Sequence, residues 1–360
     1  MCSKHKSTGE LVAIALRGAW RETPPPLELC PEELHCIAPV LLRSGSAALV
    51  WWRASRTRFA PSHIPEEFLN AYKFQTLSAA VHERNVKKVF AALNAACVDA
   101  VLVKGWAIAR RYPKPALRHY GDLDVCVRPG QFELATQVLR ASAANVWVDL
   151  HRGFATLDHE NEDSLFERAS TVSADGIPVR VPSEEDHLRI LCLHLLRHGA
   201  WRPLWLCDVA LALESGKKDF EWARFFGHDA RRKEWLSCVI GLARELVFAR
   251  IDHDTADGRT ERVPRWLVRN VLRRWSRWFN ADYRDRGLRS LLHHRFEPAR
   301  ALEDLYFRFD PLRATVEMNG AFNRLPRLPY QLAAFVGRFP EIPAQVTNLL
   351  YASAGSATEK

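Results

Sequence analysis

The chain has 360 residues, 48% hydrophobic and 26% charged, a composition ordinary for a globular protein with a sizeable core. No apolar run reaches the eighteen or so residues of a membrane helix, the first twenty residues lack the apolar core of a signal peptide, and the eight cysteines form no Cys-x-x-Cys pair. These features argue against a membrane span, secretion and a zinc site, so we expect a cytoplasmic protein without a membrane partner. The net charge of +9 is compatible with nucleic acid, a membrane surface or an anionic small substrate.

Helical patterns dominate the chain on both sides of one mixed segment. Residues 1 to 66 predict helices interrupted by prolines, and a long helical segment runs from Glu66 to Cys97. Strand patterns then alternate with helices up to about Arg180, after which the chain is again almost wholly helical. We expect an α+β fold, in which a small mixed β-sheet core is flanked by N-terminal and C-terminal helical regions. The expected parts are an N-terminal helical region, the α/β core, a helical domain and a basic C-terminal helical region with a disordered tail, at residues 1–66, 67–182, 183–251 and 252–360.

The most informative stretch is Gly121–Val127, in which two aspartates lie two residues apart in an otherwise apolar run. This alternation is typical of a half-buried strand, so Asp122 and Asp124 share one face while the apolar residues face a core. Two adjacent carboxylates repel each other unless a cation lies between them. Carboxylate oxygens suit Mg²⁺ or Mn²⁺, so the pair predicts a magnesium or manganese site. The alternative is a solvated edge strand whose charges prevent aggregation.

A phosphate-binding turn is predicted upstream of this strand. The segment Val98–Val103 predicts a strand that ends in Lys104-Gly105, and a short helical segment continues to Tyr112. Glycine at a helix start lets the backbone approach a phosphate, and Lys104 and Arg118 each offer a cationic contact. Lys104 has an alternative role as the ion-pair partner of one aspartate.

These residues together resemble the polymerase-β-type nucleotidyltransferase superfamily, in which a glycine turn and a helix precede an Asp-x-Asp strand. The segment VKGWAIARRYPKPALRHYGDLDVCV is similar to the group of uncharacterised bacterial nucleotidyltransferases, with its Lys-Gly turn, Tyr-Pro step, Arg and Gly-Asp-x-Asp strand. Lys104-Gly105 matches this subgroup and departs from the Gly-Ser pair of the wider superfamily. The resemblance covers roughly residues 70 to 215.

The resemblance implies a third carboxylate on the following strand. After a predicted helix over Gln131–Ala143, residues Val146–His151 predict that strand, and Asp149 holds the matching position. The tripeptide ending in His151 resembles the subgroup's acid-Leu-His, and this histidine either orients the carboxylate or caps the strand end. The implied roles are catalysis and metal binding for Asp122, Asp124 and Asp149, and nucleotide binding for Lys104, Gly105, Arg118 and Gly121.

A histidine-bearing helix follows, with Ser183 as its expected N-cap. His187, His194 and His198 fall in one narrow stripe, because steps of seven and four residues nearly close whole helical turns. No glutamate follows His194, which argues against a zinc-protease helix. We expect His194 and His198 either to pack this helix against the core or, with His151, to line a substrate pocket.

The basic excess is densest between Arg262 and Arg300, where Trp266, Trp275 and Trp278 alternate with arginines. Such a segment either binds single-stranded nucleic acid or forms an amphipathic helix with a tryptophan core face. The helical spacing of the tryptophans favours the second interpretation.

The predicted function is metal-dependent transfer of a nucleoside monophosphate from an NTP to an unknown acceptor, with release of pyrophosphate. A small molecule, a peptide or a sugar phosphate is favoured as the acceptor over nucleic acid. Asp122 and Asp124 would hold the metal that grips the triphosphate, Asp149 would complete a second metal site, and the Lys-Gly turn with Arg118 would position the phosphates. The alternatives are an NTP-binding regulatory module without turnover and a nucleic-acid end-modifying enzyme.

Overall fold

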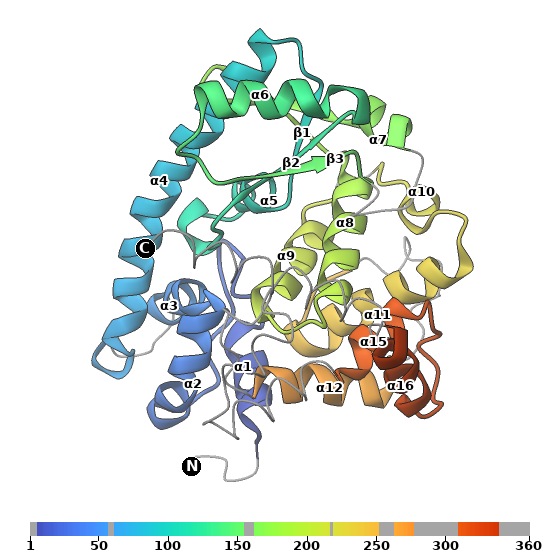
Figure 1. The fold of residues 1–360 in the computed structure, drawn as a ribbon. Helices are drawn as coiled ribbons and strands as arrows, with labels where there is room; N and C mark the ends of the chain where they lie inside the picture. The colour runs from blue at the N-terminus through green and yellow to red at the C-terminus, as the bar shows by residue number, and fades with distance from the viewer. Residues whose placement is uncertain are drawn as a thin grey trace, which may run out of the picture.

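The computed structural model describes residues 6–56, 61–154, 162–216, 219–251, 263–276 and 309–337. These residues form a sheet unit (residues 66–181) and a helical unit that contains the remaining described helices (Figure 1). The sheet unit lies above the helical unit, and one long helix, α4 (Glu66–Ala95), runs along both. The expected α+β fold is therefore confirmed.

The sheet has five strands in the order β3-β2-β1-β5-β4. Pairing is antiparallel between β1 and β2 and between β4 and β5, and parallel between β1 and β5 and between β2 and β3, so the sheet is mixed. The strands are β1 (Ala100–Val103), β2 (Leu123–Val127), β3 (Val148–Arg152), β4 (Ser170–Ala174) and β5 (Ile177–Val181).

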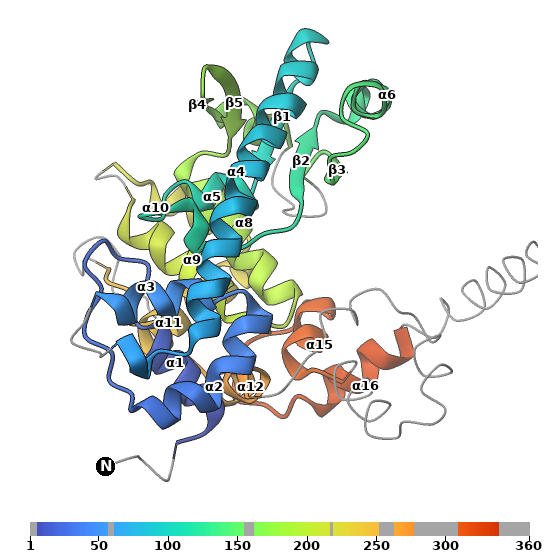
Figure 2. The same cartoon turned by 90° about the vertical axis from the view of Figure 1, so that its left-hand side faces the viewer.

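Alternation along β2 separates a core face from a site face. Leu123, Val125 and Val127 pack into the core beneath α4 and α6 (Phe132–Ser142), two helices that lie along one side of the sheet (Figure 2). Cys126 lies on the opposite face, where it packs with Phe154, one residue of a smaller apolar cluster. Because side chains alternate along a strand, Asp124 points to this second face as the sequence predicts.

Short helical elements connect the strands of the sheet. They are α5 (Gly105–Ala109) directly after β1, the single-turn helices η2 (Pro115–Leu117) and η3 (Pro129–Gln131) around β2, and α7 (Glu162–Arg168) before β4. The single-turn helix η1 (Pro61–His63) precedes α4.

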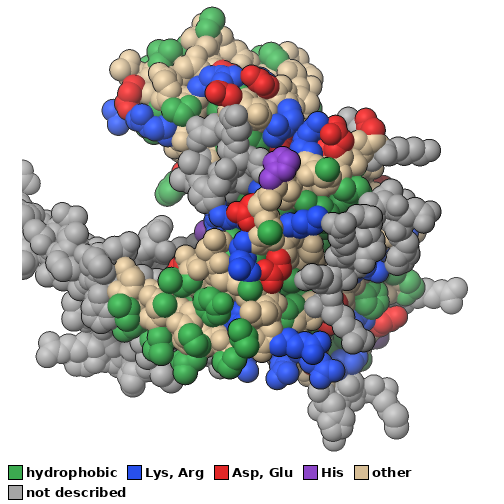
Figure 3. Space-filling model, turned by 90° about the vertical axis from the view of Figure 1, so that its right-hand side faces the viewer, with side chains coloured by type: hydrophobic (Ala, Val, Ile, Leu, Met, Phe, Trp, Pro, Cys, Tyr) green, Lys and Arg blue, Asp and Glu red, His purple; other side chains and the backbone are tan. Residues whose placement is uncertain are grey.

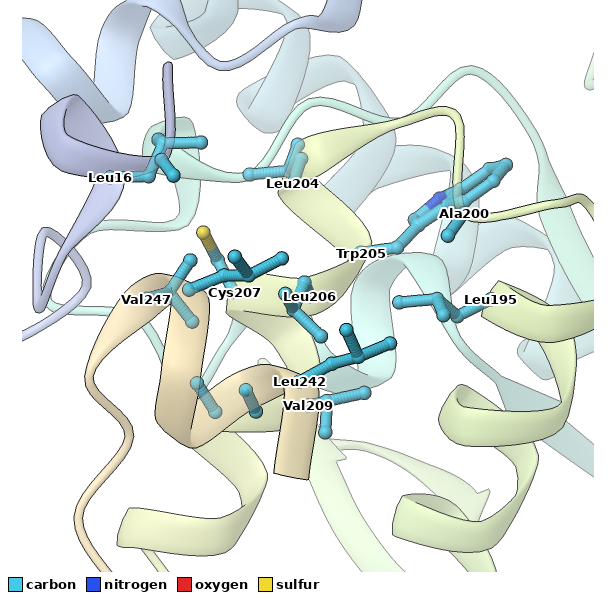
Figure 4. Packing of buried hydrophobic residues seen from close by; sticks show 14 of the residues in the cluster. Leu16, Leu195, Ala200, Leu204, Trp205, Leu206, Cys207, Val209, Leu242 and Val247 are labelled. Atoms are coloured by element: carbon cyan, nitrogen blue, oxygen red, sulfur yellow. The ribbon is translucent and has the colours of Figure 1, made fainter. Parts of the chain in front are cut away.

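The helical unit is assembled from both ends of the described chain. Its helices are α1 (Thr8–Leu16), α2 (Pro31–Ser44), α3 (Ala47–Ser55), α8 (Glu184–Arg197), α9 (Pro203–Glu214), α10 (Trp222–Phe226), α11 (Ala230–Val247), α12 (Arg265–Trp275), α15 (Pro311–Glu317) and α16 (Leu328–Gly337). One hydrophobic core joins buried residues of α1–α3 to those of α8, α9, α11 and α12. Figure 4 shows Leu16 of α1 beside Leu204 and Cys207 of α9, with Val247 of α11 close by. The four-part division of the chain stays a prediction.

Local signals in the sequence explain two features of the helical unit. Ser183 caps α8 by accepting a hydrogen bond from the Asp186 amide (3.2 Å), as expected. The tryptophans of α12 face inward: the indole of Trp275 donates to the Ala200 carbonyl (2.8 Å) and that of Trp266 to the Asn323 carbonyl (2.7 Å). The amphipathic-helix interpretation is confirmed for α12, while Trp278 and most of the arginine-rich segment lie outside the described residues.

Charged side chains are spread over the described surface in several groups (Figure 3). On the face in Figure 3, Lys and Arg side chains form scattered groups intermixed with Asp and Glu, rather than one continuous basic surface. Among the described residues, no helix combines the length and the apolar character needed to cross a bilayer.

Candidate active site

A pocket of about 520 Å³ lies where the sheet unit meets the helical unit. The sheet unit contributes residues from the ends of β1, β2 and β3, and the helical unit contributes residues from α2, α8 and α9. The lining residues are Arg43, Lys104, Gly105, Arg118, His119, Tyr120, Gly121, Asp122, Asp124, Trp147, Asp149, His194, His198, Trp201, Arg202 and Trp205.

An acidic cluster occupies the sheet side of this pocket. Parallel pairing of β2 with β3 places Asp124 in register with Asp149. The His151 Nε2 atom lies 3.4 Å from Asp124 Oδ1 and 3.3 Å from Asp149 Oδ2. One ligand atom from each of these three residues falls within 4.8 Å of the others. The prediction that Asp149 lies on the strand beside the Asp-x-Asp strand is therefore confirmed.

Asp122 lies just before β2 and lines the same pocket, outside the group of three ligand atoms. Burial and the negative charges of Asp124 and Asp149 raise the pKa of the Asp122 carboxyl. A cation placed among the three carboxylates would remove this repulsion. The role of Asp122 as a metal ligand stays a prediction.

Lys104 and His151 neutralise the carboxylates of Asp124 and Asp149. Lys104 Nζ lies 2.6 Å from Asp124 Oδ1, and both side chains are only 9% exposed. Burial raises the pKa of Asp124, but the hydrogen bond with His151 and the charge of Lys104 outweigh it and lower that pKa overall. The hydrogen bond with His151 likewise lowers the pKa of Asp149. Burial alone would lower the pKa of His151, yet its two carboxylate partners raise it to about 9.

The turn that carries Lys104 is conformationally strained. Lys104 adopts φ 54° and ψ −138°, a region that residues with a β-carbon rarely enter. Gly105 follows with φ +23°, and a β-carbon there would lie 3.3 Å from the Tyr120 ring and 3.5 Å from the Asp122 carbonyl oxygen. The glycine therefore permits close approach of α5 to the segment that leads into β2.

Replacing Gly105 with alanine is expected to destabilise the fold by about 1–3 kcal/mol, since the new methyl group meets Tyr120 in an unfavourable backbone conformation. Gly121→Ala is the matched control, because a β-carbon at this neighbouring pocket glycine has nothing within 4 Å. Denaturant unfolding of both variants measures the difference. Equal stabilities for the two variants would show that Gly105 is not needed for packing.

Arg118 has a buried partner in the helical unit. Its guanidinium pairs with Asp208 of α9, with Nη2 2.8 Å from Oδ2, and the Tyr112 hydroxyl donates to the same carboxylate at 2.8 Å. The two charged side chains are 5% and 0% exposed. Arg118 thus links the segment between η2 and β2 to the helical unit, and it still lines the pocket as the sequence interpretation requires.

Aromatic and histidine rings form the wall opposite the acidic cluster. The His194 ring lies 4.4 Å from the His198 ring and 4.6 Å from the Trp205 ring, and Trp201 lies 5.3 Å from Trp205. The two expected roles of these histidines are therefore compatible, because the rings pack together and also line the pocket. Arg202 ties this wall to the rest of the site by donating to the carbonyls of Ser44 and His119.

The donor set of the acidic cluster fits a divalent cation. Asp124 and Asp149 supply carboxylate oxygens of the kind that Mg²⁺ and Mn²⁺ prefer, and Asp122 offers another from the same pocket. His151 supplies a nitrogen, which Mg²⁺ takes less readily than transition metals do. His151 therefore fits best as the residue that orients the carboxylates.

Sequence reasoning missed several lining residues. Arg43 reaches the pocket from α2, and Arg202 reaches it from the α8–α9 turn. No local motif marks these positions, since only the packing of the helical unit brings them to the sheet. His119 and Tyr120 adjoin the Gly-Asp-x-Asp motif and were within reach of a motif-based search.

A family model described as "Uncharacterised nucleotidyltransferase" matches residues 32–147 and 142–247 of the chain. The matched residues extend from α2 to the end of α11 and contain the whole acidic cluster. Comparison with curated proteins returns no match.

Proposed function

The chain belongs to the uncharacterised nucleotidyltransferase family, and from this premise we propose that it transfers a nucleoside monophosphate from an NTP to an acceptor, releasing pyrophosphate. Enzymes of this class transfer phosphorus-containing groups and generally use divalent metals. The observation that carries the proposal is that Lys104, Asp124 and Asp149 line one pocket, with His151 beside the two carboxylates.

The carboxylates of Asp124 and Asp149 in the acidic cluster, together with that of Asp122 in the same pocket, would hold Mg²⁺ or Mn²⁺. Such an ion supplies Lewis-acid stabilisation of charge on the phosphate oxygens during in-line displacement. His151 would hold the carboxylates in place through its hydrogen bonds to Asp124 and Asp149.

Lys104 would exchange its carboxylate partner for phosphate when substrate binds. In the structure its charge is satisfied by Asp124. With Asp124 bound to a cation, the Lys104 ammonium group would be available to contact the β- and γ-phosphates. Gly105 would let the backbone approach these phosphates. Arg118 and Gly121 would complete this phosphate-binding side of the pocket.

The transfer needs no reactant other than the NTP and the acceptor. The acceptor oxygen forms a new bond to the α-phosphorus, and the bond from that phosphorus to the β-phosphate oxygen breaks. Pyrophosphate leaves with the electron pair, and the acceptor proton passes to Asp149, whose side chain lines the pocket and is 52% exposed.

The proposal is tested with the purified full chain, each of the four NTPs, and Mg²⁺ or Mn²⁺. Calorimetry should detect metal-dependent NTP binding. Pyrophosphate release should appear with one member of an acceptor panel of sugars, sugar phosphates, hydroxyl-bearing peptides and oligonucleotides. Binding without pyrophosphate release from any acceptor would instead favour a regulatory module. Release only with oligonucleotides, weakening steeply with salt, would favour an end-modifying enzyme.

A further inference from the structure

The indole of Trp147 is exposed at the rim of the active-site pocket. Trp147 is 78% exposed, more than any other large hydrophobic residue among those described, and it lines the pocket together with Asp149. Its backbone is fixed, because the Trp147 carbonyl accepts a hydrogen bond from the Leu123 amide at 3.1 Å. Trp147 directly precedes β3, and this hydrogen bond to β2 holds its backbone beside the acidic cluster.

Strand register orders the functional groups across this edge of the sheet. Asp124 pairs with Val103 of β1 on one side and with Asp149 of β3 on the other. Lys104 therefore lies at the β1 end, the aspartates at β2, and Trp147 with Asp149 at β3. Neighbouring strands are about 4.8 Å apart, so this row spans roughly 10 Å.

The geometry of in-line displacement indicates at which end of this row the leaving group lies and at which end the acceptor lies. The attacking and leaving oxygens lie on opposite sides of the α-phosphorus in such a reaction. If pyrophosphate leaves toward Lys104 and the α-phosphate lies at the β2 carboxylates, the acceptor must approach from β3. The nucleoside, which is attached to the α-phosphate through a third oxygen, is directed away from this axis, toward the wall that contains His194 and His198.

We propose that Trp147 is the platform on which a ring of the acceptor stacks while its hydroxyl group meets the α-phosphate beside Asp149. The proposal rests on the proposed function, because the in-line axis is defined by nucleotidyl transfer.

The residues that line the pocket at β3 limit the chemical class of the acceptor. An indole face binds flat surfaces, either an aromatic ring or the C–H face of a sugar ring. The pocket residues contributed by the β3 side are Trp147 and Asp149, one apolar and one acidic, and the cations Arg43 and Arg202 line the pocket from the helical unit. A ring-bearing small molecule that is neutral at its stacking end therefore fits this rim better than a polyanion does.

The test uses three hydroxyl-bearing probes with the full chain: phenyl β-glucoside, methyl β-glucoside and glycerol. Saturation-transfer NMR should show that the ring probes bind and that glycerol does not, with the protons of the stacked face receiving most of the signal. The phenyl and methyl glucosides distinguish an aromatic platform ligand from a sugar. Trp147→Ala should abolish the signal and Trp147→Phe should retain part of it. Phe74→Ala is the control, since Phe74 is 63% exposed on α4 and does not line the pocket.

Kinetics provide a second readout with the best ring acceptor. Trp147→Ala should lower its kcat/KM roughly tenfold to a hundredfold, in line with losses on removing a stacking ring, and leave the KM for the NTP unchanged. A raised KM for the NTP would mean that the ring holds the nucleobase, and would overturn the proposal. So would failure of both ring probes to bind the wild-type chain. Because probe binding needs no turnover, the two failures are distinguishable: an inactive chain that still binds ring probes through Trp147 would refute the proposed function, and with it the acceptor role, but would keep Trp147 as a ring-binding residue.

Discussion

Replacing Asp124 with asparagine is expected to lower the rate of nucleotidyl transfer by at least about a thousandfold. A bound metal ion stabilises the charge on the phosphates in the transition state by several kcal/mol, and each 1.36 kcal/mol changes the rate tenfold. Asp124 is the carboxylate that contacts both Lys104 and His151, and it is far less exposed than Asp149. An amide of the same size cannot neutralise a divalent cation. The measurement is initial-rate pyrophosphate release under saturating NTP and metal.

The matched control for this result is Asp175→Asn. Asp175 also pairs with a lysine, Lys87 at 2.8 Å, but its side chain is 78% exposed and it lies in the β4–β5 turn, outside the pocket. This variant should keep wild-type activity. Circular dichroism of both variants separates lost chemistry from lost folding, and an Asp124→Asn protein that retains activity within tenfold of wild type would refute the metal assignment.

Replacing Asp208 with alanine is expected to lower the free energy of unfolding by about 3–5 kcal/mol, the usual cost of leaving one partner of a buried ion pair unpaired. The Arg118 side chain, which is 5% exposed, would lose its carboxylate partner, and the Tyr112 hydroxyl would lose its hydrogen-bond acceptor. Urea unfolding followed by tryptophan fluorescence measures the change. A loss below about 1 kcal/mol, typical of an exposed pair, would contradict the buried geometry.

The double variant Arg118→Met/Asp208→Leu separates two roles of Arg118. Replacement of a buried pair by apolar side chains of similar volume is often neutral for stability, so the remaining cost is the Tyr112 hydroxyl left without its acceptor, about 1–3 kcal/mol, and this protein should still fold. If Arg118 only links the segment between η2 and β2 to α9, NTP affinity should then remain normal. If Arg118 also positions the phosphates, the folded double variant should bind NTP more weakly.

Local patterns in the sequence were sufficient for the parts of the site that lie on one strand or one turn. The alternation around Asp124 specified its face, because strand periodicity is a local property. The position of Asp149 on the following strand was implied by the family resemblance. The pairing of Lys104 with Asp124 was left open, since charge alone does not decide between a phosphate and a carboxylate partner.

Tertiary packing determined what the sequence did not reveal. Arg118 was interpreted as a phosphate contact, but its carboxylate partner lies 90 residues away on α9. Arg43 enters the pocket because α2 packs into the same core as α9. Such long-range contacts leave no periodic signal in a single sequence, so they could not be predicted from motif spacing.

The shared core of the helical unit also governs how the chain can fold as it is made. The Gly9 amide of α1 donates to the Ser276 hydroxyl, a residue 267 positions later, and α1 packs with α11 and α12. On the ribosome, the surface of α1 that packs against α11 and α12 therefore remains uncovered while the whole sheet unit emerges and folds. Nascent chains that stop before α12 would display this surface, so chaperone binding during synthesis and aggregation of C-terminally shortened fragments follow from the topology itself.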